Sequence, residues 1–189
     1  GPSAKNSTTF LNFNNCTNYG GQLLLSSPGT GCSSEATGVT SGHAGMMYSM
    51  AVQKKLDPPL NAEEVRAIMI MSVDDIDVPE SATDPTKFPS GPGFDLHFGY
   101  GRNNVRKSVD MIYDDEIPPE SDILHPSWFE PIEITQHPKV KVDGRIGTRM
   151  DGKPARYASY DYVLEYAKGI DPKGGWTEIK KGTTTGING

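Results

Sequence analysis

The sequence is poor in the features that build metal sites and membrane spans. Only two of its 189 residues are cysteine, and neither a Cys-x2-Cys nor a His-x3-His spacing occurs. A zinc site needs three or four converging ligands, so we expect no zinc. No apolar run approaches the roughly 18 residues that cross a bilayer, which predicts a chain without a membrane span. The polar residues 1–9 also lack the apolar core of a signal peptide.

Positive charge is scarce as well. The chain has 18 Lys and Arg against 24 Asp and Glu, a net charge of -6. Nucleic-acid-binding surfaces are basic, so this balance argues against nucleic acid as a partner. Two acidic clusters, at 74–77 and 114–116, offer oxygen ligands of the kind that calcium prefers. Neither has the EF-hand spacing, so we interpret both as solvated loops and expect no cofactor.

The residues that carry most information are 26–51, SSPGTGCSSEATGVTSGHAGMMYSMA. A Pro-Gly turn and a serine-rich segment run directly into small and apolar residues at helical spacing, which predicts a helix from Ala36. The free N–H groups at the start of such a helix favour negative charge, so a serine hydroxyl there lies beside an anion site. An ordinary capped helix after a turn explains the same pattern.

Three further segments, in chain order, resemble the subtilisin-like serine peptidases. Residues 15–29 resemble the turn, apolar strand and turn that precede the nucleophile of that family. Residues 60–76 are similar to the helix after it, and residues 93–109, GFDLHFGYGRNNVRKSV, are similar to the G-x-G-x-x-N-A-x-x-A-V ending of the catalytic domain. The resemblance covers about residues 12–111. It implies an α/β fold, the C-terminal part of a three-layer catalytic domain.

The resemblance also implies a nucleophile, in one of two registers. The family pattern G-T-S-x-A-x-P-x-x-A-G places its serine on Ser34 if three extra residues precede Ala44, and on Thr37 if the helix is aligned without a gap. We prefer Ser34 because it lies nearer the turn and carries the less hindered hydroxyl. An insertion of about one helical turn also keeps the later helix face in register.

The base that would activate this hydroxyl is not evident in the chain. All four histidines, His43, His97, His125 and His137, follow the candidate nucleophile, whereas the family's Asp, His and oxyanion-hole Asn precede it. An unassisted hydroxyl is a poor nucleophile. The resemblance therefore implies that the chain is inactive alone and is completed by the N-terminal part of the same protease. His43 could line a cleft, but a packed helix histidine is the commoner case.

The two cysteines, Cys16 and Cys32, flank the turn, strand and turn before the predicted helix. A disulfide between them would close a loop of about fifteen residues and stabilise the fold by roughly 3 kcal/mol. Two free thiols are the alternative. A disulfide implies an oxidising compartment, so we expect a secreted or periplasmic protein.

Composition changes in the second half of the chain. We divide the chain into residues 1–112, the catalytic-domain part, residues 113–127, a linker rich in proline and acidic residues, and residues 128–189, a β-rich module. Strand patterns occur at 129–134, 139–147, 160–169 and 176–179. The module is similar to a fibronectin type III domain, of which these four strands form only a partial β-sandwich.

Two functions remain open from the sequence. The first is part of a secreted serine endopeptidase that carries the nucleophile and acts on a protein or peptide substrate. The second is a non-catalytic scaffold of the same ancestry whose β-rich module binds protein or carbohydrate.

Overall fold

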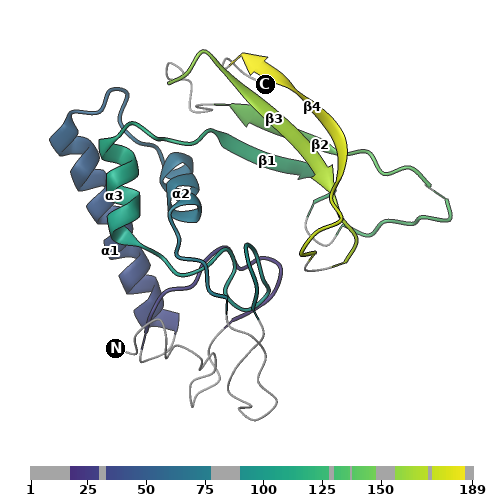
Figure 1. Ribbon diagram of the computed structural model, residues 1–189, viewed down its shortest axis with the longest axis horizontal. Coiled ribbons are helices and arrows are strands. Elements are labelled where there is room, and N and C mark those ends of the chain that lie inside the picture. The colour runs from purple at the N-terminus through teal and green to yellow at the C-terminus, as the bar shows by residue number, and fades with distance from the viewer. Residues whose placement is uncertain are drawn as a thin grey trace, which may run out of the picture.

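The computed structural model describes residues 18–29, 33–77, 90–127, 130–136, 138–147, 156–169 and 172–185. Within these ranges the chain combines helices with small antiparallel sheets, which confirms the broad α/β expectation. Figure 1 shows α1 and α3, the first and last of the described helices, side by side. α2 lies between this pair and β1. The elements in chain order are α1 (Ser33–Lys54), α2 (Ala62–Met71), α3 (Val105–Tyr113), β1 (Glu120–His125), β2 (Asp143–Gly147), β3 (Ser159–Tyr166) and β4 (Thr177–Thr185).

α1 is a 22-residue helix with one buried side, and it begins three residues before the predicted start. Its buried residues His43, Met47 and Ala51 recur every four positions and therefore lie on one face. α1 packs against α3, and the backbone leaves the helix through Lys55, whose φ of 57° is left-handed. Neither α1 nor any other helix in the described ranges is both long and apolar enough to span a membrane.

α2 is specified by its cap and its apolar face. The side chain of Asn61 accepts a hydrogen bond from the backbone N–H of Glu64, and the Glu64 side chain accepts one from the backbone N–H of Asn61. This reciprocal capping box satisfies donors that the first turn of a helix leaves without partners. Val65, Ile68 and Met69 then follow at helical spacing and are buried.

The hydrophobic core lies where the three helices meet. Met47, Ile68 and Ile112 each contribute a side chain that is 0% exposed, one from each helix. Burying a side chain of this size contributes roughly 1.5–3 kcal/mol. Ile117, only 3% exposed, extends the core beyond α3. It lies in the range predicted as a linker, and that range also contains β1.

The segment that leads into α1 is held by a loop far along the chain. The backbone N–H of Tyr100 donates to the Leu24 carbonyl at 2.9 Å, and that of Ser26 donates to the Gly101 carbonyl at 2.8 Å. Gly99 has a φ of +66°, and a Cβ placed on it would lie 2.5 Å from the Leu24 carbonyl carbon. Only glycine fits this conformation and this close approach.

Each sheet is a pair of antiparallel strands, β1 with β2 and β3 with β4. β2, β3 and β4 fall in or overlap three of the ranges that the sequence predicts as strands, 139–147, 160–169 and 176–179. The fourth prediction is wrong as far as the structure describes it, because residues 130–134 form no strand. That segment alternates apolar and acidic residues but pairs with no strand among the residues that the structure describes, and pairing is what stabilises a strand.

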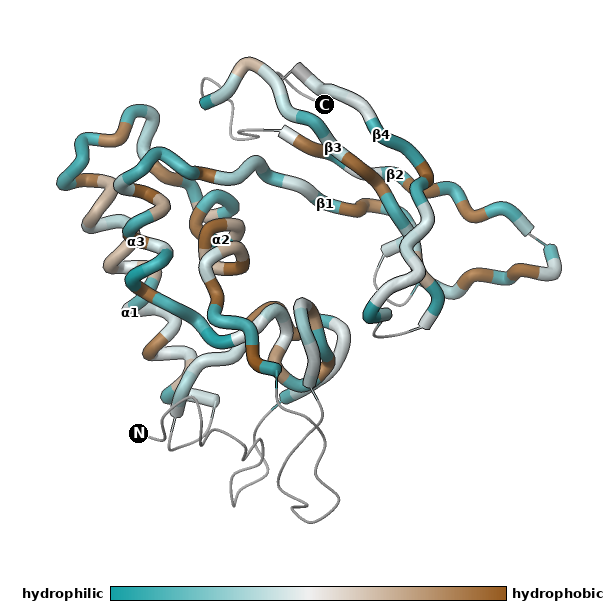
Figure 2. The backbone as a smooth tube through the Cα atoms, in the orientation of Figure 1, coloured by the Kyte–Doolittle hydropathy of each residue, from teal (hydrophilic) through white to brown (hydrophobic). Residues whose placement is uncertain are grey.

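The sheets leave large apolar side chains exposed. Figure 2 shows hydrophobic positions along β1, β2 and β3 as well as in α2. In α2 Val65, Ile68 and Met69 are buried, although Met71 at its end is 67% exposed; in and beside the strands many apolar side chains are 40% exposed or more. A two-stranded sheet is marginally stable in water, so these sheets depend on contacts with other parts of the chain. The exposed residues include Ile123, Leu124, Val163, Tyr166, Trp176 and Ile179.

Candidate functional site

The two candidate nucleophiles lie at the start of α1. Ser34 is the second residue of the helix, Thr37 follows nearly one turn later, and both are exposed. The Thr37 hydroxyl donates to the Ser33 carbonyl at 2.9 Å, a local bond that threonine often makes in helices. This bond occupies the hydroxyl proton of Thr37. Ser34 is the candidate nearer to the helix start.

The first turn of α1 also sets the local electrostatics. The first four N–H groups of a helix have no partner within it, and this end of the helix carries partial positive charge. Glu35 adds a carboxylate to the same turn. A Cβ placed on Gly29 would lie 3.6 Å from the Glu35 Oε2, so the loop before the helix runs beside this carboxylate. The turn can stabilise negative charge on an oxygen near Ser34 through its backbone N–H groups.

His43 lies on the same helix but is directed to other partners. It is 2% exposed, and its Nε2 lies 2.7 Å from the Oγ of Ser108 on α3. His43 lies nine positions after Ser34 in the helix, an axial distance of roughly 13 Å. Burial lowers the pKa of His43 below its usual value. The structure thus places this histidine in a helix interface, as a packed residue and not beside the candidate nucleophile.

The ring of His43 is only half satisfied. Its Nδ1 has no hydrogen-bond partner among the described residues. If the ring proton lies on Nε2, that nitrogen donates to Ser108 and Nδ1 is an unpaired acceptor. The other neutral form would bury an unpaired N–H donor. The contacts therefore favour the Nε2–H form.

Of the other three histidines, His97 and His125 lie within the described residues and contact different partners. His97 stacks on Tyr19, with 6.0 Å between the ring centroids. The Nδ1 of His125, at the end of β1, lies 3.5 Å from an oxygen of Glu130. His137 is outside the described residues, as are Cys16 and Cys32, so the predicted disulfide stays a prediction.

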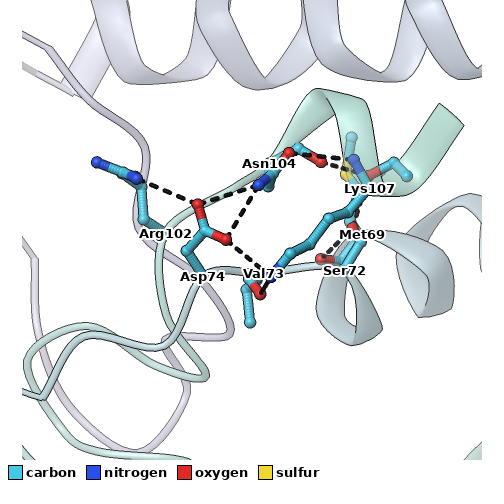
Figure 3. A network of polar contacts seen from close by, with 8 residues as sticks. Met69, Ser72, Val73, Asp74, Arg102, Asn104 and Lys107 are labelled. Atoms are coloured by element: carbon cyan, nitrogen blue, oxygen red, sulfur yellow. Dashed lines mark hydrogen bonds and ion pairs between the residues drawn. The ribbon is translucent and has the colours of Figure 1, made fainter. Parts of the chain in front are cut away.

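A polar network continues from His43 to the surface beside α3, and Figure 3 shows most of it. The Oγ of Ser108 lies 2.6 Å from that of Ser72, the C-cap residue of α2, and 3.1 Å from the backbone carbonyl of Asn104. Asn104 caps α3 by accepting the backbone N–H of Lys107. The network thus joins α1, the end of α2 and the start of α3.

Asp74 closes the network at the surface (Figure 3). Lys107 and Arg102 form ion pairs with its carboxylate, at 2.8 and 3.1 Å, and the Asn104 amide donates to both oxygens at 3.0 Å. These hydrogen bonds, above all that from Lys107, lower the pKa of Asp74 to about 2. With both oxygens engaged by cationic and amide donors, Asp74 is poorly suited to bind calcium.

One further residue of each acidic cluster is also engaged. Asp75 accepts the backbone N–H of Gly93 at 2.8 Å, and Asp115 pairs with Lys54 at 2.7 Å. Within the described ranges, no group of three His, Cys, Asp or Glu side chains is arranged to hold a metal ion.

Sequence reasoning identified the start of α1 but not the network behind it. One local signal was available: Asn104 stands directly before a short helical segment, where an N-cap is expected. Nothing local pairs His43 with Ser108, 65 residues away. Comparisons of the chain with protein-family models, with curated proteins and with solved structures returned no match.

Proposed function

We propose that this chain is the nucleophile-bearing part of a subtilisin-like serine endopeptidase and that Ser34 attacks the scissile carbonyl of a peptide substrate. One observation carries the proposal. The two segments that resemble the family on either side of the nucleophile, around Leu25 and around Gly99, pair with each other, and the Leu25 segment precedes α1 in the chain. Their pairing positions the start of the helix on which Ser34 is exposed.

The chemistry requires a base from outside the described residues. Ser34 supplies an exposed hydroxyl, and the first-turn N–H groups of α1 are oriented to stabilise an oxyanion. The His43 ring is hydrogen-bonded to Ser108, and this contact lies far from the start of α1. A His and an Asp from the N-terminal part of the protease complete the site in this proposal, so the chain is inactive alone.

The finer fold belongs to the same proposal. α1, α2 and α3 correspond to helices of the C-terminal part of a three-layer catalytic domain. The strands that follow belong to a β-sandwich module of which this chain contains a part. A disulfide between Cys16 and Cys32 would brace the loop before α1, and the protein is secreted or periplasmic.

A non-catalytic binding function is the second candidate, and exposed aromatic residues favour it. Trp176 is 54% exposed and Tyr166 is 52% exposed, and Tyr166 pairs in register with Thr177, the residue after Trp176. Exposed aromatic rings at the end of a hairpin can pack against sugars or apolar side chains. In this alternative the β-rich part binds protein or carbohydrate and Ser34 has no catalytic role.

Labelling with a fluorophosphonate probe tests the two candidates. The intact protein, as its source produces it, is compared with Ser34→Ala and with the matched control Thr37→Ala. Both residues are exposed in α1, so each substitution should change stability by no more than about 0.5 kcal/mol.

We expect labelling of the intact protein and of Thr37→Ala, and none of Ser34→Ala. The reverse pattern would move the nucleophile to Thr37. An intact, folded protein that does not react at all would refute the catalytic proposal and favour the binding function.

A further inference from the structure

Arg156, which precedes β3, binds the start of α2. Its Nε lies 2.6 Å from one oxygen of Glu64 and its terminal nitrogen lies 2.9 Å from the other. The same terminal nitrogen donates to the carbonyls of Pro58 and Pro59, at 2.8 and 3.3 Å. This two-point geometry fits a guanidinium and does not fit the single ammonium of a lysine.

The pair is almost completely buried. The Arg156 side chain is 7% exposed and that of Glu64 is 0% exposed. Glu64 is also the residue that closes the capping box of α2, since its Oε2 accepts the backbone N–H of Asn61. A buried carboxylate without its cation is strongly destabilising. The cap of α2 therefore depends on a residue 92 positions later in the chain.

Neighbouring contacts connect the start of α2 to β1, and the segment before β3 to the end of α3. The Asn61 amide donates to Glu120, the first residue of β1, at 2.7 Å, and Glu120 is 4% exposed. The hydroxyl of Tyr157 donates to the Asp115 carbonyl at 2.6 Å and accepts the backbone N–H of Ile117 at 3.3 Å. Two consecutive residues before β3 are thus fixed to the helical part.

The opposite end of the β3–β4 hairpin has its own anchor. Lys173, in the connection between the two strands, donates to the Phe94 carbonyl at 2.6 Å. Its side chain also lies close to Gly91, where an added Cβ would be 3.3 Å from the Lys173 Cε. Residues 91–94 lead directly into the loop that pairs with the segment before α1.

We propose that the β3–β4 hairpin, with Arg156 and Lys173 at its two ends, is a clamp that holds α2 and the 91–99 loop in place. In this view the C-terminal strands are a structural part of the helical fold and not a module on a flexible tether. α2 shares its core with α1, so the clamp also fixes the helix that carries Ser34. Arg156 is a positioning residue, and its role does not depend on whether Ser34 is catalytic.

Amide hydrogen exchange on the full chain tests the clamp. The variant Arg156→Met is compared with Arg145→Met, which removes a more exposed arginine that pairs with Asp122 inside the β1–β2 sheet. We expect Arg156→Met to lower the protection of the α2 amides by at least about tenfold, and Arg145→Met to leave α2 unchanged. Adding Glu64→Gln to Arg156→Met should restore part of the protection, because it removes the unpaired buried charge.

Two other variants complete the test. Arg156→Lys keeps the charge but loses the two-point geometry, so it should fold and show a smaller loss in α2; it decides the case if Arg156→Met does not fold. Lys173→Met should lower protection in the 91–99 loop and leave α2 protected. Unchanged α2 protection in a folded Arg156 variant, or a loss confined to β3 and β4, would overturn the proposal.

Discussion

Replacing Ser108 with alanine tests whether the buried network stabilises the helical part. Ser108 is 0% exposed, and its Oγ is the only hydrogen-bond partner of the His43 ring among the described residues. Ser108→Ala leaves both ring nitrogens of a buried histidine without a partner. An orphaned buried polar group costs about 1–3 kcal/mol, and alanine favours the helix by a few tenths of a kcal/mol. We expect a net loss of about 2 kcal/mol in the free energy of unfolding.

Two further variants calibrate this value. Ser72→Ala leaves the contact between His43 and Ser108 intact, so it should cost less, about 1 kcal/mol. Ser49→Ala alters an exposed serine of α1 and should stay within about 0.5 kcal/mol of the original protein. Urea unfolding followed by circular dichroism at pH 7.5 gives all three free energies, provided that the slope with urea is unchanged. If Ser108→Ala proves as stable as Ser49→Ala, the network does not stabilise the fold.

The same network predicts a pH dependence. Burial lowers the pKa of His43 in the folded state below the value of 6.5 that applies to the unfolded chain. Below pH 6.5 the unfolded chain therefore binds a proton that the folded state resists. The His43 contribution to stability is complete above pH 6.5 and is lost as the pH falls toward the lowered pKa, at up to about 1.4 kcal/mol per pH unit. His43→Gln should remove this loss, whereas His125→Gln should retain it.

Two more perturbations test the loop beside α1 and the surface end of the network. Gly99→Ala should destabilise the fold by at least about 2 kcal/mol in urea unfolding, because the added Cβ would overlap the Leu24 backbone and the residue has a positive φ. The control Gly42→Ala lies in open space on α1 and should stabilise the fold by about 0.5–1 kcal/mol. Equal stability of these two variants would contradict the close approach. Asp74→Asn should cost about 1 kcal/mol at pH 7, a modest value because the carboxylate is 33% exposed. Since Lys107 and other donors lower the pKa of Asp74 to about 2, this difference should persist above pH 4 and disappear as the pH falls toward 2; a pH-independent difference would refute the assignment.

The local elements of the helical part follow from local sequence signals. α2 could be predicted because Asn61 and Glu64 form a capping box within four residues and the apolar face follows at once. α1 could be predicted from small and apolar residues at helical spacing. The strands were less predictable. Alternation at 130–134 suggested a strand, yet a strand also needs a partner, and partners are chosen by the whole fold.

In the candidate site, too, some features follow from local sequence and others only from the tertiary structure. Ser34 and its alternative Thr37 were proposed from the family resemblance and from a pattern of adjacent residues, hydroxyls near the start of a helix, and the catalytic role stays a prediction. The ring of His43 was not assigned a partner, because its contact with Ser108 spans 65 residues. The extent of the helical core could not be predicted either, because Ile117 belongs to the core but lies in a segment whose proline content predicts a linker.

By itself, the sequence determined the acidic, cysteine-poor character of the chain and predicted α1 and α2, with Ser34 and Thr37 as alternative positions for a candidate nucleophile. Capping, periodicity and charge depend on residues close together in the chain, so these features can be recognised from the sequence alone. Only the tertiary structure decided that Arg156 completes the cap of α2, that His43 is buried against Ser108, and that Asp74 is held by Arg102 and Lys107. These contacts join residues 28 to 92 positions apart, and packing of the whole chain selects them from many possible partners.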